Sequence, residues 1–86
     1  MQVVIPTQLR DYTHDEANVE ASGSTVAEVL SDLDRQFPGI RFRIVDEQDR
    51  VRPHLRIFVN EEQTRTLDAS VAITDRILIF GALSGG

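Results

Sequence analysis

Residues 25–37 read TVAEVLSDLDRQF, and this stretch decides the fold. Thr25, followed three residues later by Glu28, is typical of a capping box, in which both side chains accept hydrogen bonds from backbone N–H groups at the start of a helix. The apolar residues that follow recur at helical spacing and form one stripe: Val26, Val29, Leu30, Leu33 and Phe37. Pro38-Gly39 ends the helix. No other segment shows comparable helical periodicity, so the stripe is predicted to cover a β-sheet.

Short β-branched or alternating segments lie on both sides of this helix. Strands are predicted at residues 2–6, 18–21, 55–60 and 75–80, with a short edge strand and a turn within 64–72. The first and last are both strongly β-branched, as expected of neighbours in the centre of a sheet. The order β-β-α-β-(β)-β is the β-grasp arrangement, an α+β domain with one helix packed across a mixed sheet of four or five strands. We expect this domain to span residues 1–80, with residues 81–86 as a flexible C-terminal tail.

Two connections are predicted to be loops. Residues 7–16 are polar and are interpreted as a loop or wide hairpin turn, and residues 40–53 are interpreted as a charged connection. The second contains the acidic run 46–49, which lacks the glycine and the late glutamate of an EF-hand loop. A solvated loop is therefore expected there, and no metal site.

Charge and composition exclude several classes of function. The 86 residues include nine arginines, no lysine and no cysteine, and the net charge of −5 argues against a nucleic-acid partner. Without cysteine there is no disulfide framework, thiolate metal site or cysteine nucleophile. No apolar run approaches the roughly 20 residues that cross a bilayer, and the first residues do not resemble a signal peptide. We expect a cytoplasmic protein without a membrane partner.

The sequence ends in Gly85-Gly86. A terminal pair of glycines presents a carboxylate on backbone without Cβ atoms, narrow enough to enter a slot in an enzyme. The α-carboxyl group has a pKa of about 3.5 and is ionised at neutral pH. It could therefore attack the α-phosphate of ATP, and a sulfur or nitrogen nucleophile could then displace AMP. With neither lysine nor cysteine, the chain has no strong side-chain nucleophile to capture its own activated terminus.

Alternation along the last two long strands predicts a second apolar surface. If Ile57, Val59, Ile77 and Ile79 face the helix, the side chains that face the other way are Phe58, Leu78 and Phe80, beside Arg56 and Arg76. Apolar groups rimmed by arginines are typical of a protein-docking surface. The alternative is that a loop covers them.

Taken together, these motifs resemble the MoaD/ThiS-type ubiquitin-like sulfur carriers over essentially the whole chain. The motifs that carry the resemblance are Ile5-Pro6-Thr7-x-Leu9-Arg10, Gly23-Ser24-Thr25-Val26, Phe37-Pro38-Gly39-Ile40, Ile57-Phe58-Val59-Asn60-Glu61 and Gly85-Gly86. The first is most similar to carriers of the cysteine-pathway type. The sequence departs from the family pattern at Leu83-Ser84 before the diglycine and at Thr74-Asp75 before the last strand, which leaves the acceptor enzyme open.

The resemblance implies a cycle with three partners. A ubiquitin-activating-type enzyme adenylates Gly86, a persulfide or sulfide donor replaces AMP, and the thiocarboxylate then gives its sulfur to an acceptor synthase in the synthesis of cysteine, molybdopterin, thiamine or another metabolite. Gly86 would carry the sulfur, and Gly85, Ser84 and Leu83 would form the tail that enters the slot. Phe58, Leu78 and Phe80 would lie at the docking face. ATP would bind the activating partner, so no cofactor is expected on this chain.

Catalysis by the chain itself has no support in the sequence. His14 and His54 lie in loop-like surroundings without triad spacing, Glu61-Glu62 has no opposing carboxylate, and no glycine-rich phosphate loop precedes a helix. We therefore expect a co-substrate without an active site. Two alternatives stay open: a protein modifier joined through Gly86 to lysines of target proteins, and a β-grasp interaction domain whose tail is inert.

Overall fold

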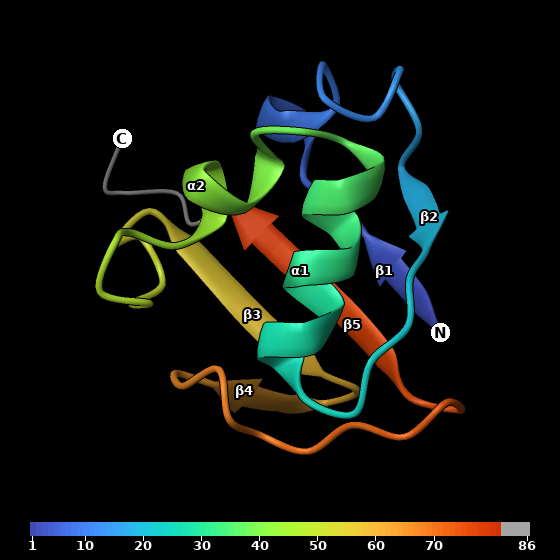
Figure 1. Cartoon of the computed structure of the whole chain (residues 1–86), viewed down its shortest axis with the longest axis vertical. Helices are drawn as coiled ribbons and strands as arrows, with labels where there is room; N and C mark the ends of the chain where they lie inside the picture. The colour runs from blue at the N-terminus through green and yellow to red at the C-terminus, as the bar shows by residue number, and fades with distance from the viewer. Residues whose placement is uncertain (82–86) are drawn as a thin grey trace.

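A five-stranded mixed sheet forms one layer of the molecule and helix α1 crosses it (Figure 1). The computed structural model describes residues 1–81. Its elements are β1 (Gln2–Val4), the 3-10 helix η1 (Thr7–Leu9), β2 (Asn18–Glu20), α1 (Val26–Gln36), α2 (Ile40–Ile44), β3 (Leu55–Val59), β4 (Glu62–Thr64) and β5 (Arg76–Gly81). The strand order is β2-β1-β5-β3-β4. The predicted α+β, β-grasp class is confirmed.

The first and last strands lie side by side, as their composition predicts. β1 and β5 pair in parallel, with Val3 opposite Ile77, while β1–β2, β3–β5 and β3–β4 are antiparallel. β5 occupies the middle of the sheet. β5 is also the last described element, so residue 82 follows in the sequence directly after the central strand.

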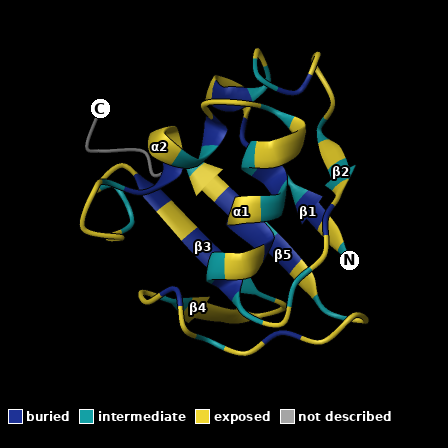
Figure 2. Ribbon diagram, in the orientation of Figure 1, coloured by how far each residue is buried: buried dark blue, intermediate teal, exposed yellow. Residues whose placement is uncertain are grey.

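Helix α1 buries four of the five residues of the predicted stripe against one face of the sheet, whereas Phe37, at the C-terminal cap, is only half-buried. Val26, Val29, Leu30 and Leu33 are fully buried in one cluster with Val3, Ile57 and Ile77 (Figure 2). The cap forms as predicted at one end, where the Glu28 N–H donates to Thr25 Oγ1 at 3.2 Å. Glu28 Oε1 accepts from the N–H of Ser24 at 2.8 Å, one residue before the usual partner in a capping box.

The interpretation of residues 40–53 as a simple connection is wrong, because it begins with a second helix. Gly39 adopts φ 98°, a left-handed conformation that favours glycine, and α2 follows directly. Ile40, Ile44 and Val45 are fully buried in the same core as α1. Both helices therefore lie on the same face of the sheet. Only the remainder of the segment is an exposed turn.

The predicted place of the edge strand is also wrong. β4 starts at Glu62, directly after a two-residue turn at Asn60-Glu61, in which Asn60 adopts φ 56°. Within residues 65–75 the chain is irregular, yet Leu67 and Val71 are buried. This segment satisfies the open end of α1, because the carbonyls of Ala69 and Leu67 accept from the first backbone N–H groups of the helix.

Residues 7–16 are more ordered than a simple loop. η1 opens the segment, Leu9 is buried, and the Thr13 hydroxyl is buried and donates to the Glu16 carbonyl at 2.8 Å.

In the part of the chain that the structure describes, no helix has the length and apolar character needed to span a membrane.

Candidate functional site

The sheet face opposite α1 and α2 carries the residues predicted for docking. Strand pairing places Phe58 directly opposite Leu78, and Leu78 opposite Val4 on its other side. In the next row, Phe80 lies opposite Arg56. We call this surface the open face, defined by Val4, Phe58, Leu78, Phe80, Arg56 and Arg76.

Two aromatic rings form the centre of the open face. Phe58 and Phe80 meet edge to face, with ring centroids 5.5 Å apart and planes at 75°. Phe58 and Leu78 are half-buried, whereas Phe80 remains 45% exposed. The alternative, that a loop covers these side chains, is therefore not realised within residues 1–81. A partner that covers this surface would bury apolar area that water now contacts.

The two arginines of the open face lie at its edges and are exposed. The Arg56 guanidinium donates to the carbonyls of Pro53 and Leu55, each at 2.9 Å, which holds it beside the start of β3. The backbone N–H of Arg76 donates to the Asn60 side chain at 3.0 Å and fixes the start of β5. This arrangement gives an apolar centre with a positive rim.

The open face continues to the point where the tail begins. Gly81 ends β5, and the Gln8 side chain lies so close to it that an added Cβ atom would be 2.1 Å from Gln8 Nε2. A hollow of about 240 Å³ beside these residues is bordered by Val4, Pro6, Phe80 and Gly81 among others. The remaining tail residues predicted to act, Leu83, Ser84, Gly85 and Gly86, lie outside the described residues.

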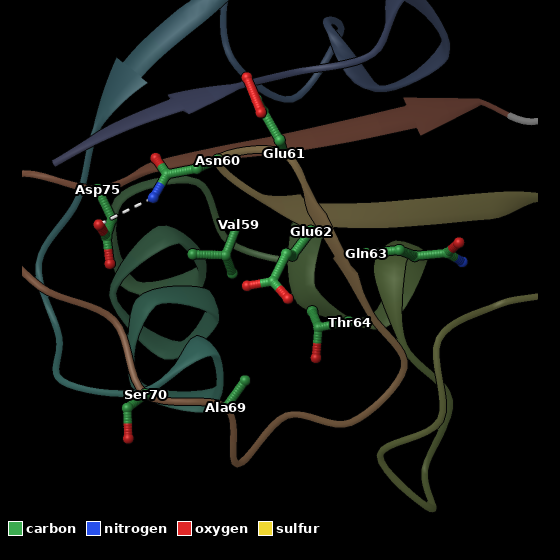
Figure 3. Close-up of a pocket in the computed structure, with 9 residues that line it drawn as sticks. All are labelled: Val59, Asn60, Glu61, Glu62, Gln63, Thr64, Ala69, Ser70 and Asp75. Carbon is green, nitrogen blue, oxygen red and sulfur yellow. Dashed lines mark hydrogen bonds between the residues drawn. The ribbon is translucent and has the colours of Figure 1, made fainter.

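A larger hollow, of about 640 Å³, lies near the other end of β5 and is lined by nine residues, among them Glu62 and Thr64 (Figure 3). Two of its polar side chains, Asn60 and Asp75, hold the turn before β5: Asn60 donates to Asp75 Oδ1 at 3.0 Å (Figure 3), and the Ala72 N–H donates to Asp75 Oδ2 at 2.8 Å. The Ala72 N–H, followed by the Asn60 side chain, lowers the pKa of Asp75 below its ordinary value. A carboxylate held ionised by turn amides is the opposite of a general acid.

The other candidates for chemistry are dispersed. His14 and His54 are both exposed, and His14 packs edge-on near Phe37 with centroids 6.3 Å apart. The pKa of Asp46 is lowered chiefly by the N–H of Arg50, which also closes the turn at residues 46–50. Among residues 1–81 no group of three metal-ligating side chains comes together. Within residues 1–81 the structure thus brings together the open face and the start of the tail, while the candidate catalytic side chains stay apart.

Two residues of this region were not predicted. Val4 belongs to the open face, and its outward position follows from alternation along β1, because Val3 and Ile5 are both fully buried. The Gln8 side chain lies beside Gly81, although the two residues are far apart in the sequence, and no local sequence pattern indicates such a contact.

Sequence comparison with known proteins gives two consistent findings. Residues 3–86 match the ThiS family. The chain is 37% identical over 89 residues to the sulfur carrier protein CysO of Mycobacterium tuberculosis and to that of Mycobacterium bovis, covering 98% of this chain and 96% of each relative.

Solved structures agree with the sequence comparisons. The structure of the Amycolatopsis orientalis BexX/CysO complex matches with a TM-score of 0.89 and 36% identity, over 99% of this chain and 98% of the matched chain. CysO of Mycobacterium tuberculosis matches with the same TM-score and 33% identity, over 95% and 98%. Small archaeal modifier protein 1 of Methanosarcina acetivorans matches at 0.80 with 23% identity, over 99% and 94%, which shows the shared fold alone.

Proposed function

The chain belongs to the ThiS family, and from this premise we propose that it is a sulfur carrier whose Gly86 carboxyl group is converted to a thiocarboxylate. The resemblance predicted from the sequence motifs is confirmed. The observation that carries the proposal is a family match that extends through the diglycine to residue 86. The two mycobacterial relatives named sulfur carrier proteins support a role in the cysteine pathway.

The first chemical step activates the carboxyl group. A Gly86 carboxylate oxygen attacks the α-phosphorus of ATP, the bond to the β-phosphate oxygen breaks, and pyrophosphate leaves. The product is an acyl-adenylate, in which AMP is a good leaving group. Glycine at positions 85 and 86 suits this step because the backbone without side chains can pass through a narrow slot to the nucleotide.

The second step installs sulfur. A sulfide ion attacks the acyl carbon, the carbon–oxygen bond to AMP breaks, and AMP leaves with the electron pair, so that Gly86 ends in a thiocarboxylate. If the donor is a persulfide, the first product is an acyl persulfide, and a second thiol must then attack its outer sulfur to release the thiocarboxylate and a disulfide. The chain contains no lysine or cysteine to intercept the acyl-adenylate.

The body of the protein acts as the recognition element in this proposal. ATP binds the activating enzyme, and the chain supplies no catalytic side chain of its own. The half-exposed Phe80 ring with its Phe58 neighbour docks on the partner and holds the start of the tail in place. Arg56 and Arg76 form the polar rim of that contact. A relative crystallised as the BexX/CysO complex supports the expectation of a protein partner.

Pyrophosphate exchange tests the proposal. The protein, a ubiquitin-activating-type enzyme of the ThiS-carrier class, ATP and labelled pyrophosphate should give labelled ATP only when the carrier is present. Deletion of Gly86 should abolish the exchange and leave the urea-denaturation midpoint unchanged, because the deleted residue lies beyond the last strand. Equal exchange with and without Gly86 would refute the role of this carboxyl group.

Pyrophosphate exchange separates the carrier from an inert tail, whereas the product formed after adenylation separates it from a protein modifier, which is adenylated as well. A protein modifier would appear in cell extracts as adducts joined through Gly86 to lysines of other proteins. An inert tail would give no exchange with any activating enzyme. The carrier predicts exchange, and sulfur incorporation when a donor is added.

A further inference from the structure

Four arginines surround a hollow beside β3. The hollow measures about 450 Å³ and lies between residues 50–53, the start of β3, and the end of β4 with Arg65 after it. We call it the arginine hollow, after Arg50, Arg52, Arg56 and Arg65, which line it. None of its ten lining residues is an aspartate or glutamate. This is a local concentration of positive charge on a chain whose net charge is −5.

Most of this positive charge is not neutralised by the protein. The ion pairs within residues 1–81 use Arg35, Arg41 and Arg50. Arg50 is the only one of these three in the hollow, where it pairs with Asp46 at 3.4 Å. Within the described chain, the guanidinium groups of the other three hollow arginines have no carboxylate partner.

Neutral acceptors hold two of these three side chains in place. Arg52 donates twice to the Phe42 carbonyl, at 2.9 and 2.7 Å, and its guanidinium lies 4.6 Å from the centroid of the Phe42 ring. Arg56 donates to the carbonyls of Pro53 and Leu55. These contacts fix the positions of the two groups without cancelling their charge, so they are pre-positioned for an external anion.

The arginine hollow adjoins the start of the tail. Leu55 lines the hollow and pairs directly with Gly81, the last residue of β5. Five residues follow Gly81, and an extended chain of that length spans at most about 18 Å. A partner that receives the extended tail therefore comes into contact with the hollow, while its nucleotide site lies farther away beside Gly86.

We propose that the arginine hollow docks a carboxylate-rich patch of the adenylating enzyme, next to the slot that receives residues 82–86; this inference rests on the proposed function. Guanidinium groups bind carboxylates through paired hydrogen bonds and suit such an interface. Fourteen acidic residues on the remaining surface disfavour a nucleic-acid partner. The triphosphate of ATP is the less suitable anion, because with the tail extended it lies at the far end of the tail.

Charge reversal at Arg65 tests this docking. Arg65 is exposed and lies outside the open face, and no hydrogen bond of its side chain is present within residues 1–81, so Arg65→Glu is expected to fold normally. Arg35→Glu is the matched control: it changes the charge equally on the exposed side of α1, where loss of the ion pair with Asp32 costs little. Urea denaturation verifies that both variants are folded.

The readout is the rate of carrier-dependent pyrophosphate exchange as a function of carrier, ATP and salt concentration. Arg65→Glu should lower kcat/KM for the carrier about tenfold at low salt, through KM, and should weaken the salt dependence seen with the unmodified protein. The KM for ATP should not change, and Arg35→Glu should stay within about twofold of the unmodified protein.

Two results would overturn the docking proposal while leaving the carrier function intact. In the first, Arg65→Glu exchanges pyrophosphate as efficiently as the unmodified protein with the same salt dependence. In the second, its defect appears in the KM for ATP, which would assign the hollow to the nucleotide. Failure of the unmodified protein itself to support exchange would instead refute the proposed function.

Discussion

Replacing Phe80 with alanine should impair activation far more than folding. Truncation of a fully buried phenylalanine to alanine lowers the free energy of unfolding by about 3 to 5 kcal/mol. An edge-to-face aromatic pair contributes about 0.5 to 1.5 kcal/mol to that free energy. Phe80 is 45% exposed and keeps one aromatic partner, Phe58. We therefore expect Phe80→Ala to lower the free energy of unfolding by about 2 kcal/mol, which a domain with the usual 5 to 15 kcal/mol tolerates.

The effect of Phe80→Ala on the activation rate should be larger than its effect on the fraction of folded protein. If Phe80 is an anchor of the interface, its truncation costs at least about 2 kcal/mol of binding, equivalent to about 30-fold in kcat/KM for activation. Pyrophosphate exchange measured below saturation with carrier gives this ratio, and urea denaturation gives the fraction folded under the same conditions.

A second exposed apolar residue provides the control. Ile73 is 83% exposed and lies in the turn before β5, away from the start of the tail. Ile73→Ala removes comparable exposed apolar surface and should leave both stability and exchange nearly unchanged. If Phe80→Ala is folded and is activated as efficiently as Ile73→Ala, the open face is not the docking surface.

Three further predictions concern the fold that supports this surface. Gly23→Ala should cost about 2 to 3 kcal/mol in urea denaturation, because the added Cβ atom would lie 2.7 Å from the backbone nitrogen of Val29; a normal midpoint would contradict this packing. Thr25→Ala should cost about 1 kcal/mol and Thr25→Ser much less, since only the hydroxyl accepts from Glu28. In the folded protein the pKa of the Asp75 carboxyl group is lowered from 3.8. The ionised carboxylate therefore stabilises the fold above pH 3.8, and this stabilisation is lost as the pH falls through the lowered pKa of the folded state. Asp75→Asn should therefore reduce the urea midpoint at about pH 6 more than at about pH 3, and an equal loss at both would refute the assignment.

The long elements of the fold were predictable because their pattern is local. The stripe from Val26 to Leu33 and the alternation around Ile57 and Ile77 report burial directly, and the inward-facing apolar residues there are buried, except that Val59 is only half-buried. Helix α2 was missed because its five residues include Arg41 and Arg43, and only Ile40 and Ile44 mark its buried side. Two apolar positions are too few to reveal a helical period.

The displaced edge strand has a different cause. Leu67 and Val71 have the apolar character of a strand, yet they are buried in an irregular segment that accepts hydrogen bonds from the start of α1. That role depends on tertiary contacts and leaves no periodic signal. β4 instead follows Asn60, which tolerates the left-handed turn that brings Glu62 opposite Val59.

In the candidate site, too, the features that follow from a local pattern were predictable and those that depend on tertiary contacts were not. Strand alternation predicted the outward positions of Phe58, Leu78 and Phe80, and the structure has them there. Their role in docking stays a prediction, as do the roles of Gly85 and Gly86. The arginine hollow could not be predicted, because its arginines come from the turn after α2, from β3 and from the segment after β4, which only the folded sheet brings together.

The most direct test of the sulfur-carrier account is the intact mass of the protein after incubation with ATP, the activating enzyme and sulfide. The account predicts a mass increase equal to the replacement of one oxygen atom by sulfur, located by fragmentation at Gly86. An unchanged mass under conditions in which a known ThiS-type carrier is converted by the same enzyme class, or sulfur found at any other residue, would contradict it.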